Sequence, residues 1–421
     1  MNIGLIGSGG REHALCKKLF DSKFTENIIC FPGNPGTSMM ATNVEVDVLD
    51  FKKILKYIRF YKIDLVVVGP EEPLVKGIVN FLKKNGVKVF GPNKFASKLE
   101  GSKSFMKTIC AQNKIPTAKF KICNTKSQVT SFVNKCKLPI VVKADGLAAG
   151  KGVTICKTKH QIIKATSEIF YGKFKSSKKA VLEEFLEGEE ASYFVIVDNN
   201  SFKFFGSAQD HKQVYEKDRG PNTGGMGAYS PSRLINKNLE NKILDKIINP
   251  TLNALSDIGC SYKGFLYAGL MIVNQEPYLI EYNVRMGDPE CQTILPKLKT
   301  DFAEIIFACV NKKLDSINLD WSEEKSLCVV LCSKGYPDKY EKKVKINNLN
   351  VLKLDNNNYL FHAGTVIEDN EILAVGGRVL NFISLSENLS SARENIHNNL
   401  NKLNWVEGFY RKDIAFKVIG K

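Results

Sequence analysis

The sequence predicts an α/β protein with three parts: an N-terminal domain built on a doubly wound parallel sheet, a central mixed α/β domain with a small lid, and a strand-rich C-terminal domain. Apolar runs rich in valine and isoleucine alternate with helical patterns over the first hundred residues. The centre mixes both patterns around glycine-rich segments, and short alternating segments dominate after it. The predicted domains are 1–102, 103–325 and 326–421, with the lid at roughly 118–190.

The N-terminal domain repeats a strand and helix pattern. A short apolar run at 2–7 is followed by helical spacing at 13–20 and by a second apolar run at 28–31. The same order continues with a helix at 51–61, a β-branched strand at 64–69, a helix at 74–84 and a strand at 87–90. This alternation predicts a parallel sheet, because each helix carries the chain back across it.

The central domain opens with a helix predicted at 102–113. Two strand-rich lengths, 195–206 and 264–281, flank a glycine-rich loop at 219–231 and a helical stretch at 238–257. We therefore expect a mixed α/β unit here.

The C-terminal domain begins where the pattern changes to short alternating strands. Such segments lie at 328–332, 344–346 and 365–367, and each is ended by a turn. This spacing is typical of a compact, strand-rich domain.

Composition excludes several classes of protein. The net charge of +16 is spread along the chain as lysine, so nucleic-acid binding is not predicted, although the field would attract phosphorylated substrates. The N-terminal residues do not indicate a secretory signal, and no apolar run approaches the roughly 20 residues of a membrane helix, so no membrane partner is expected. Eleven scattered cysteines without a C-x-x-C pair indicate packed thiols in a reducing cytoplasm.

The first strand ends in a glycine-rich turn, Gly7-Ser8-Gly9-Gly10-Arg11-Glu12. It begins like a dinucleotide fingerprint, but Glu12 occupies the place of the third glycine. The second strand ends Cys30-Phe31-Pro32, without the acid that would hold a ribose, so a dehydrogenase is disfavoured. The turn either binds a smaller phosphate or is purely structural.

The most informative segment is an apolar strand that delivers Lys143 and then a small-residue loop with Gly150, Lys151 and Gly152. It has the composition of a phosphate cradle. A Walker loop is excluded, because the glycine spacing is one residue short and Gly152 replaces the hydroxyl that would bind magnesium. A metal must then be held by carboxylates elsewhere, unless the loop is only a hairpin tip.

Oxygen ligands follow on a later strand. The period of two puts Glu281, Asn283 and, if the strand continues, Arg285 on one face. Carboxylate and amide oxygens suit Mg²⁺, which takes one or two protein groups together with phosphates and water. The alternative is a half-exposed polar strand face.

Two further segments have less certain roles. The acidic run at 183–190 is a turn in isolation, but beside a nucleotide its backbone could bind adenine while a carboxylate takes the ribose hydroxyls. The segments 209–212 and 220–227 are polar and rich in glycine, which loses much entropy on ordering and so suggests a function. A lone histidine such as His211 is more often structural than catalytic.

Taken together, these segments resemble the phosphoribosylamine-glycine ligase family of ATP-grasp enzymes along the whole chain. The matching segments are 7–15, 32–36, 67–74, 143–153, 183–192, 209–212, 220–231, 281–292, 362–365 and 376–380. The resemblance implies that the central domain is an ATP-grasp domain and the first a Rossmann-like domain. It also implies a cytoplasmic, monomeric enzyme of purine synthesis that takes ATP, glycine and 5-phosphoribosylamine as substrates, with Mg²⁺ or Mn²⁺.

The resemblance also implies roles for individual residues. The nucleotide contacts it implies are Lys103, Lys143, Gly150, Lys151 and Gly152 at the phosphates, Glu183, Glu184, Phe185 and Leu186 at adenine, Glu190 at the ribose, and Lys212 as a further contact. It implies Glu281 and Asn283 as metal ligands, Arg285 and Asp210 as catalytic residues that contact glycine, and Gly9, Gly10 and Arg11 as sugar-phosphate contacts.

The chain departs from the family pattern at several positions. Gln213 stands where arginine is usual, and Met286 where phenylalanine is usual. The strand at 264–273 lacks the acid that many ATP-grasp enzymes place beside the metal-binding strand. Other readings are a different carboxylate-amine ligase or carboxylase of the superfamily, or a nucleotide-binding module without turnover; intact Lys143 and Glu281 argue against the module.

Overall fold

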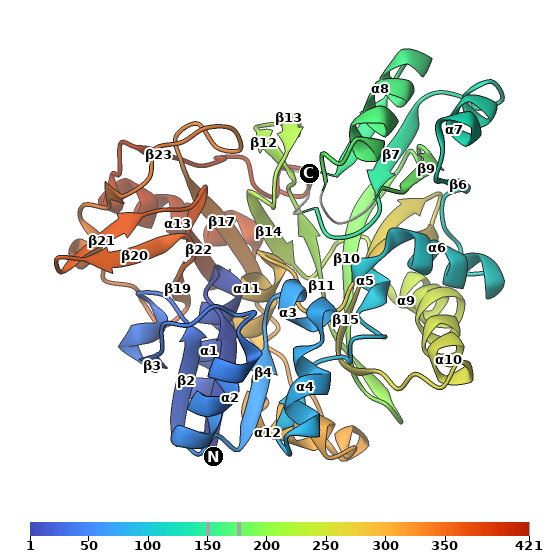
Figure 1. Ribbon diagram of the computed structural model, residues 1–421. Helices are drawn as coiled ribbons and strands as arrows, with labels where there is room; N and C mark the ends of the chain where they lie inside the picture. The colour runs from blue at the N-terminus through green and yellow to red at the C-terminus, as the bar shows by residue number, and fades with distance from the viewer. Residues whose placement is uncertain (149–151, 175–177, 421) are drawn as a thin grey trace.

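The N-terminal part forms a parallel sheet with strand order β3-β2-β1-β4-β5 in the computed structural model, which describes residues 1–148, 152–174 and 178–420 (Figure 1). The strands are β1 (Asn2–Gly7), β2 (Asn27–Pro32), β3 (Thr42–Asn43), β4 (Leu65–Val68) and β5 (Lys88–Phe90). The helices are α1 (Gly10–Phe20), η1 (Thr37–Met39), α2 (Phe51–Phe60), α3 (Glu71–Lys76) and α4 (Ile78–Lys84). The predicted doubly wound sheet is confirmed.

One helix expected in this part is broken in two. Gly77 has a φ of +98° and ends α3, where its N–H donates to the carbonyls of Pro73 and Leu74. Glycine adopts this left-handed conformation without steric cost, so it ends one helix and begins the next.

The lid is a small antiparallel sheet with strand order β6-β9-β7-β8, which projects at the upper right of Figure 1. Its elements are β6 (Phe120–Cys123), α7 (Lys126–Val133), β7 (Ile140–Ala144), β8 (Val153–Cys156), α8 (Lys159–Phe170) and β9 (Ala180–Glu184). Helices α5 (Lys98–Gly101) and α6 (Lys103–Gln112) lead into it. Ile140, Val142, Ile162 and Leu182 are buried in a core of its own, so the lid packs as a separate unit.

A large sheet, β16-β15-β10-β11-β14-β17-β22-β19, continues from the central into the C-terminal part. Its strands are β10 (Glu189–Asp198), β11 (Phe202–Asp210), β14 (Gly227–Ser230), β15 (Lys263–Val273), β16 (Glu276–Asn283), β17 (Lys325–Ser333), β19 (Asn358–His362) and β22 (Arg378–Ser386), and β23 (Gly408–Phe409) pairs with β17. The two parts are joined where β14 pairs with β17, with Ala228 opposite Cys328.

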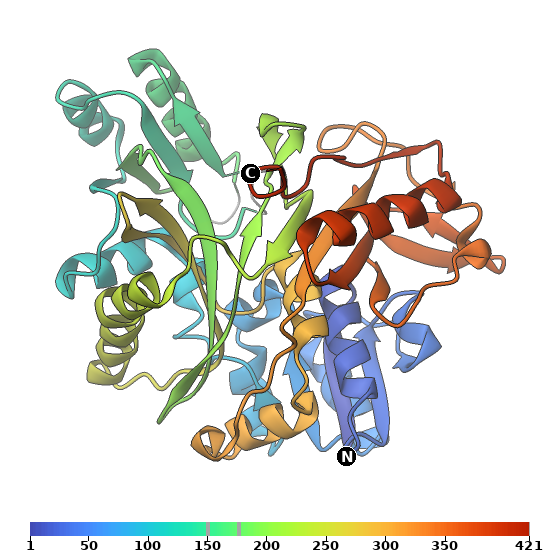
Figure 2. The same cartoon turned by 180° about the vertical axis from the view of Figure 1, so that it is seen from behind.

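Helices cover this sheet (Figure 2). They are α9 (Lys237–Ile243), the π-helical turn η2 (Leu244–Ile248), α10 (Asn249–Asp257), α11 (Glu290–Ile294), η3 (Leu295–Lys297), α12 (Phe302–Val310), η4 (Leu314–Ser316) and α13 (Leu389–Leu403). The small sheet β18-β21-β20 completes the C-terminal part, with β18 (Val344–Lys345), η5 (Leu349–Val351), β20 (Thr365–Glu368) and β21 (Glu371–Ala374). A strand-rich C-terminal domain is confirmed, but α13 was not predicted.

The segment 219–231 was expected to be a loop, and that expectation is wrong. It contains β13 (Arg219–Asn222), which pairs with β12 (Gln213–Tyr215), and then β14. β14 has strands on both sides, and the φ of +156° at Gly227 brings the position of a Cβ within 2.4 Å of the Cys328 carbonyl oxygen. Glycine is needed there because a side chain would collide with the neighbouring strand.

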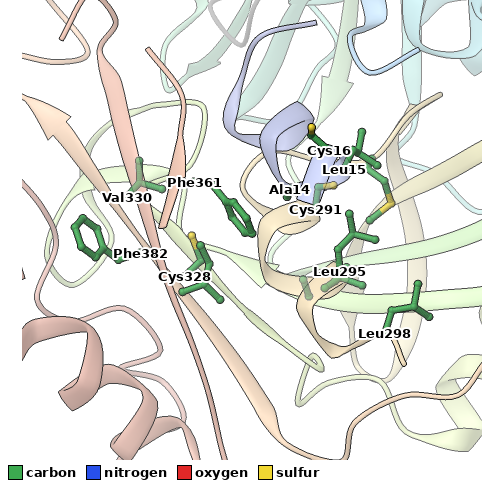
Figure 3. Packing of buried hydrophobic residues seen from close by; sticks show 14 of the residues in the cluster. Ala14, Leu15, Cys16, Cys291, Leu295, Leu298, Cys328, Val330, Phe361 and Phe382 are labelled. Carbon is green, nitrogen blue, oxygen red and sulfur yellow. The ribbon is translucent and has the colours of Figure 1, made fainter. Parts of the chain in front are cut away.

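A shared core ties the first helix to the C-terminal sheet. Ala14 and Leu15 of α1 face Cys291 and Leu295, and Phe361 lies in the same cluster (Figure 3). This packing holds the N-terminal glycine-rich turn against the C-terminal part. Throughout the described ranges, no helix combines the length and the apolar content needed to cross a bilayer.

Candidate active site

A cavity of about 330 Å³ lies between the lid and the large sheet. Lid strands β7, β8 and β9 contribute one wall, and β15 and β16 contribute the other. One end is apolar, with Val141, Ile155, Phe185, Met271 and Leu279 among the lining residues. The apolar end of the cavity suits a flat, mostly apolar ring.

Three lysines line the middle of the cavity. Lys103 donates to the carbonyl of Gly146 at 3.0 Å, and Lys143 lies 3.0 Å from a Glu183 carboxylate oxygen. Lys212 lies 2.5 Å from a Glu190 carboxylate oxygen. These residues come from α6, β7 and the turn between β11 and β12, so the fold brings cations together from distant parts of the chain.

The predicted metal ligands face the same space. Glu281 pairs with Gly269 and Asn283 with Tyr267 across β15 and β16, and both line the cavity. Burial alone would raise the pKa of Glu281, but the surrounding cations Lys212, Lys143, Lys103 and Arg285 outweigh it and hold that pKa below its ordinary value. Glu281 is therefore an ionised oxygen donor, which is what a divalent cation requires.

The two residues would need help from substrate and water to complete a metal shell. Among the described residues, no group of three or more His, Cys, Asp or Glu side chains is arranged to hold an ion. Magnesium commonly accepts this situation, because it keeps several waters and binds phosphate oxygens directly. Glu281 and Asn283 therefore fit an ion that arrives with a nucleotide.

Arg285 lies just beyond the end of β16 and still lines the cavity. Its Nη2 donates to Glu100 at 2.7 Å and its Nε donates to Glu71 at 3.2 Å. Burial raises the pKa of Glu100 to about 7, and Arg285 opposes this rise. Burial also disfavours the charge of Glu71, but Arg285 and Arg11 lower its pKa to about 2. The guanidinium is thus held in place by two acids.

Asp210 also lines the cavity. Its Oδ1 is buried and has no hydrogen-bond partner among the described residues. Burial, followed by the charge of Glu290, raises the pKa of Asp210 well above its ordinary value. Lys212 and Arg378 oppose this rise without cancelling it, so the position suits a further cationic group from a ligand.

Comparison with known proteins identifies the family. Models of the phosphoribosylglycinamide synthetase N domain, ATP-grasp (A) domain and C domain match residues 1–100, 101–291 and 326–417. The chain belongs to the phosphoribosylglycinamide synthetase family. As an ATP-grasp enzyme of purine biosynthesis, it is a ligase that acts on small molecules and uses ATP with a divalent metal.

Individual relatives support the same assignment. The chain is similar to the phosphoribosylamine–glycine ligase of Brucella melitensis, with 42% identity over 100% of this chain and 98% of that protein. The solved phosphoribosylamine–glycine ligase of Thermotoga maritima has a TM-score of 0.87 and 32% identity, covering 98% of this chain and 100% of its own. A biotin carboxylase from Campylobacter jejuni, with a TM-score of 0.70, 15% identity and coverage of 95% and 91%, shares the fold alone.

Most of the predicted site residues line this cavity. The predicted residues that line the cavity are Lys103, Lys143, Gly152, Glu183, Glu184, Phe185, Leu186, Glu190, Asp210, Lys212, Glu281, Asn283 and Arg285. Gly150 and Lys151 lie outside the described residues.

The N-terminal turn lies beside this group. Arg11 is buried, with its Nε 2.5 Å from Glu12 and its Nη1 3.7 Å from Glu71. Gly10 packs closely against Asn381 and Gln292, and the backbone N–H of Gly9 donates to Glu12 at 2.7 Å. The turn therefore meets the residues that line the cavity at Glu71 and, beside Gly9, at Asp288.

Sequence reasoning missed several acids of the site. Glu290 lies on α11, lines the cavity, and accepts hydrogen bonds from Tyr267 at 2.9 Å and Ser192 at 3.1 Å. It lies against the strand whose missing acid we noted, so a carboxylate is supplied from another element. Glu71 and Glu100 were missed as well, because an isolated glutamate at a helix start carries no signal of its partner.

The departures from the family pattern are accommodated locally. Met286 is buried, and its carbonyl accepts from Arg285 at 3.1 Å and from Arg11 at 3.3 Å. The carbonyl of Gln213 accepts from Arg411 at 3.0 Å. His211 accepts from the N–H of Ala415 at 3.1 Å, and burial lowers its pKa to about 4, so its role is structural.

Proposed function

We propose that this protein joins glycine to 5-phosphoribosylamine, with ATP as the energy source, and releases glycinamide ribonucleotide, ADP and phosphate. The observation that carries the proposal is one cavity in which Lys103, Lys143 and Lys212 meet Glu281 and its strand neighbours beside a fixed arginine. The relatives whose names state this activity cover the chain from end to end.

The nucleotide would lie along the cavity with its base at the apolar end. The backbone at Glu183, Glu184, Phe185 and Leu186 would bind adenine, and Glu190 would take the ribose hydroxyls. Lys103, Lys143 and Lys212, together with the loop residues Gly150, Lys151 and Gly152, would contact the phosphates. Cations placed in advance stabilise the charge that accumulates on these oxygens.

Glycine would lie between Arg285 and Asp210. The guanidinium suits the glycine carboxylate, and Asp210 suits the ammonium group, which would give its buried Oδ1 a hydrogen-bond donor. This pose points the carboxylate at the γ-phosphoryl group. Gly9, Gly10 and Arg11 would contact the sugar phosphate of the second substrate.

The reaction then proceeds in two displacements. A glycine carboxylate oxygen attacks the γ-phosphorus, a P–O bond forms, and the bond to the ADP oxygen breaks. The amine of phosphoribosylamine attacks the carbonyl of the resulting glycyl phosphate, a C–N bond forms, and phosphate leaves with the C–O bond electrons while the amine gives up a proton. Catalysis is mainly positioning, and a lid closed over the cavity would protect the acyl phosphate from water.

We further propose Mg²⁺ or Mn²⁺ as the metal, held by Glu281 and Asn283. Such an ion neutralises the crowded phosphate oxygens when it is bound. We also propose a monomer in the cytoplasm, without a nucleic-acid or membrane partner, and a division of the chain into 1–102, 103–325 with a lid at roughly 118–190, and 326–421.

The test is ADP release from purified protein with Mg²⁺ and ATP. Glycine and freshly generated phosphoribosylamine are added separately and then together, and we expect ADP only with both. ADP release that ignores glycine but responds to bicarbonate or another carboxylate would favour a different ATP-grasp ligase or carboxylase. Tight ATP binding without any turnover would favour a non-catalytic module.

A further inference from the structure

Lys107 is a lysine of the central domain with none of its side chain exposed. It lies one helical turn after Lys103 on α6, and its Nζ is 2.8 Å from Glu183 Oε2. The same Nζ donates to Thr117 Oγ1 at 2.6 Å. Burying an ammonium group is costly unless it is paired and hydrogen-bonded, and Lys107 meets both conditions.

Glu183 is shared between two lysines. Its carboxylate oxygens lie 3.0 and 3.1 Å from Lys143 Nζ, on the neighbouring strand, as well as 2.8 Å from Lys107. Among the described residues that surround the cavity, Lys143 lines it and Lys107 does not. Lys107 therefore acts on a bound nucleotide indirectly, and Glu183 is its link to Lys143.

Lys107, Glu183 and Lys143 form a charged trio, and its net charge affects how strongly the cavity attracts phosphate. Glu183 alone would neutralise Lys143 and would be free to pull its ammonium away from the cavity. With Lys107 present, two positive charges share one negative charge, so the group keeps a net charge of +1 toward the cavity. At the short distances inside a protein this difference is weakly screened.

The trio is also attached to the metal-binding strand. Thr117, which accepts from Lys107, donates to the carbonyl of Leu279 at 2.6 Å, and the N–H of Leu279 donates to Pro116 at 2.8 Å. Leu279 lies two residues before Glu281 on β16. Lys107 thus connects the lid strand that carries Glu183 to the strand that carries Glu281.

We propose that Lys107 is a positioning residue for ATP: it fixes the Glu183 carboxylate and, through it, holds the Lys143 ammonium on the nucleotide phosphates with its charge uncancelled. This rests on the proposed function, because it assumes that the phosphates bind beside Lys143. No contact between Lys107 and the substrate is involved.

The test compares Lys107→Met with Lys121→Met, a change to an exposed lysine on lid strand β6. We expect Lys107→Met to weaken the binding of ATP about tenfold or more, the size expected for loss of a charge-assisted contact, while binding of adenosine changes less than about twofold. We expect the KM for ATP to rise and the KM for glycine to stay unchanged. Lys121→Met should match the unmodified protein.

A double-mutant cycle separates positioning from general packing. In a Glu183→Gln background, we expect Lys107→Met to weaken ATP binding much less than in the unmodified protein, because the connection to Lys143 is already lost. An equal effect in both backgrounds, or parallel losses of ATP and adenosine binding, would overturn the proposal. If Lys107→Met does not fold, Lys107→Gln takes its place with the same expected and contrary outcomes.

Failure of the proposed function gives a different result. If the unmodified protein neither binds ATP nor forms ADP with both substrates, the function itself is wrong and this inference falls with it. If the unmodified protein is active and Lys107→Met binds ATP with unchanged affinity, only the inference is overturned.

Discussion

Glu281 offers the sharpest single-residue test of the nucleotide and metal site. Glu281→Gln keeps the size of the side chain but removes the charge that the surrounding lysines stabilise. We expect ADP formation to fall by about a hundredfold or more, since the loss of one preorganised charged contact costs this much. The matched control is Glu276→Gln on the same strand, where the carboxylate makes surface ion pairs with Lys242 and Lys246. Similar losses of ADP formation in the two variants would show that Glu281 does not act in the nucleotide and metal site.

Arg285 tests the glycine end of the site. Arg285→Lys keeps the charge but cannot donate to both Glu71 and Glu100 with the geometry of the guanidinium fork. We expect the KM for glycine to rise about tenfold, on the scale of one charge-assisted hydrogen bond, and the KM for ATP to change little. Steady-state kinetics with each substrate varied in turn measures this. If only the KM for ATP changed, Arg285 would contact the nucleotide and not glycine.

Single residues could be predicted where residue type and spacing carry chemistry. Lys143 ends an apolar strand before a glycine-rich loop, and Glu281 and Asn283 alternate on a strand, so their position in one cavity was expected. Glu290 could not be found in this way, because its link to Tyr267 depends on how α11 packs on β15. Lys107 was not predicted either, because its contact with Glu183 depends on how α6 packs against lid strand β9.

The C-terminal segment 411–417 acts as an element that holds the β12–β13 hairpin. Arg411 is 1% exposed, and its guanidinium contacts Asp413 at 2.8 Å and Asp218 of the hairpin turn at 3.0 Å. Lys417 lies 2.7 Å from Asp218. We expect Arg411→Met to lower the free energy of unfolding by on the order of 3 kcal/mol, because Asp413 loses its cation and Asp218 keeps only Lys417.

Denaturant unfolding measures this loss, and limited proteolysis tests whether the cleavage falls in the hairpin. Arg59→Met is the control, since Arg59 is exposed on α2 of the N-terminal part. Equal stability of the two variants would mean that the C-terminal segment does not hold the hairpin.

Helices and strands were predicted well where the local sequence pattern determines the secondary structure. They were predicted poorly where pairing with a distant strand determines it. The β-branched run at β4 and the helical spacing of α2 were sufficient to locate those elements. β14 is short and glycine-rich, and it becomes a strand because β11 and β17 supply hydrogen bonds on both sides. No local pattern contains that information, so the same residues look like a loop in the sequence.

At the scale of the whole molecule, buried histidines lie where distant parts of the chain meet. His13 of α1 accepts from the N–H of His362 at 2.8 Å, which joins the N-terminal and C-terminal parts. His211 accepts from Ala415 at the C-terminal segment. A ring nitrogen that accepts a hydrogen bond carries no proton, so protonation must break these contacts.

Acid should therefore loosen the molecule at these junctions together. Burial lowers the pKa of His13 to about 3 and of His211 and His362 to about 4, below the ordinary value of 6.5. The unfolded chain binds more protons than the folded chain between those values, so stability is full above pH 6.5 and falls as the pH drops toward 4. Each histidine costs up to about 2 kcal/mol at pH 5. Denaturant unfolding at pH 7.5 and 5.5 measures the slope, which His13→Gln should reduce and the exposed control His160→Gln should not. A slope that is the same in all three proteins would show that carboxylates, and not the buried histidines, set the acid limit.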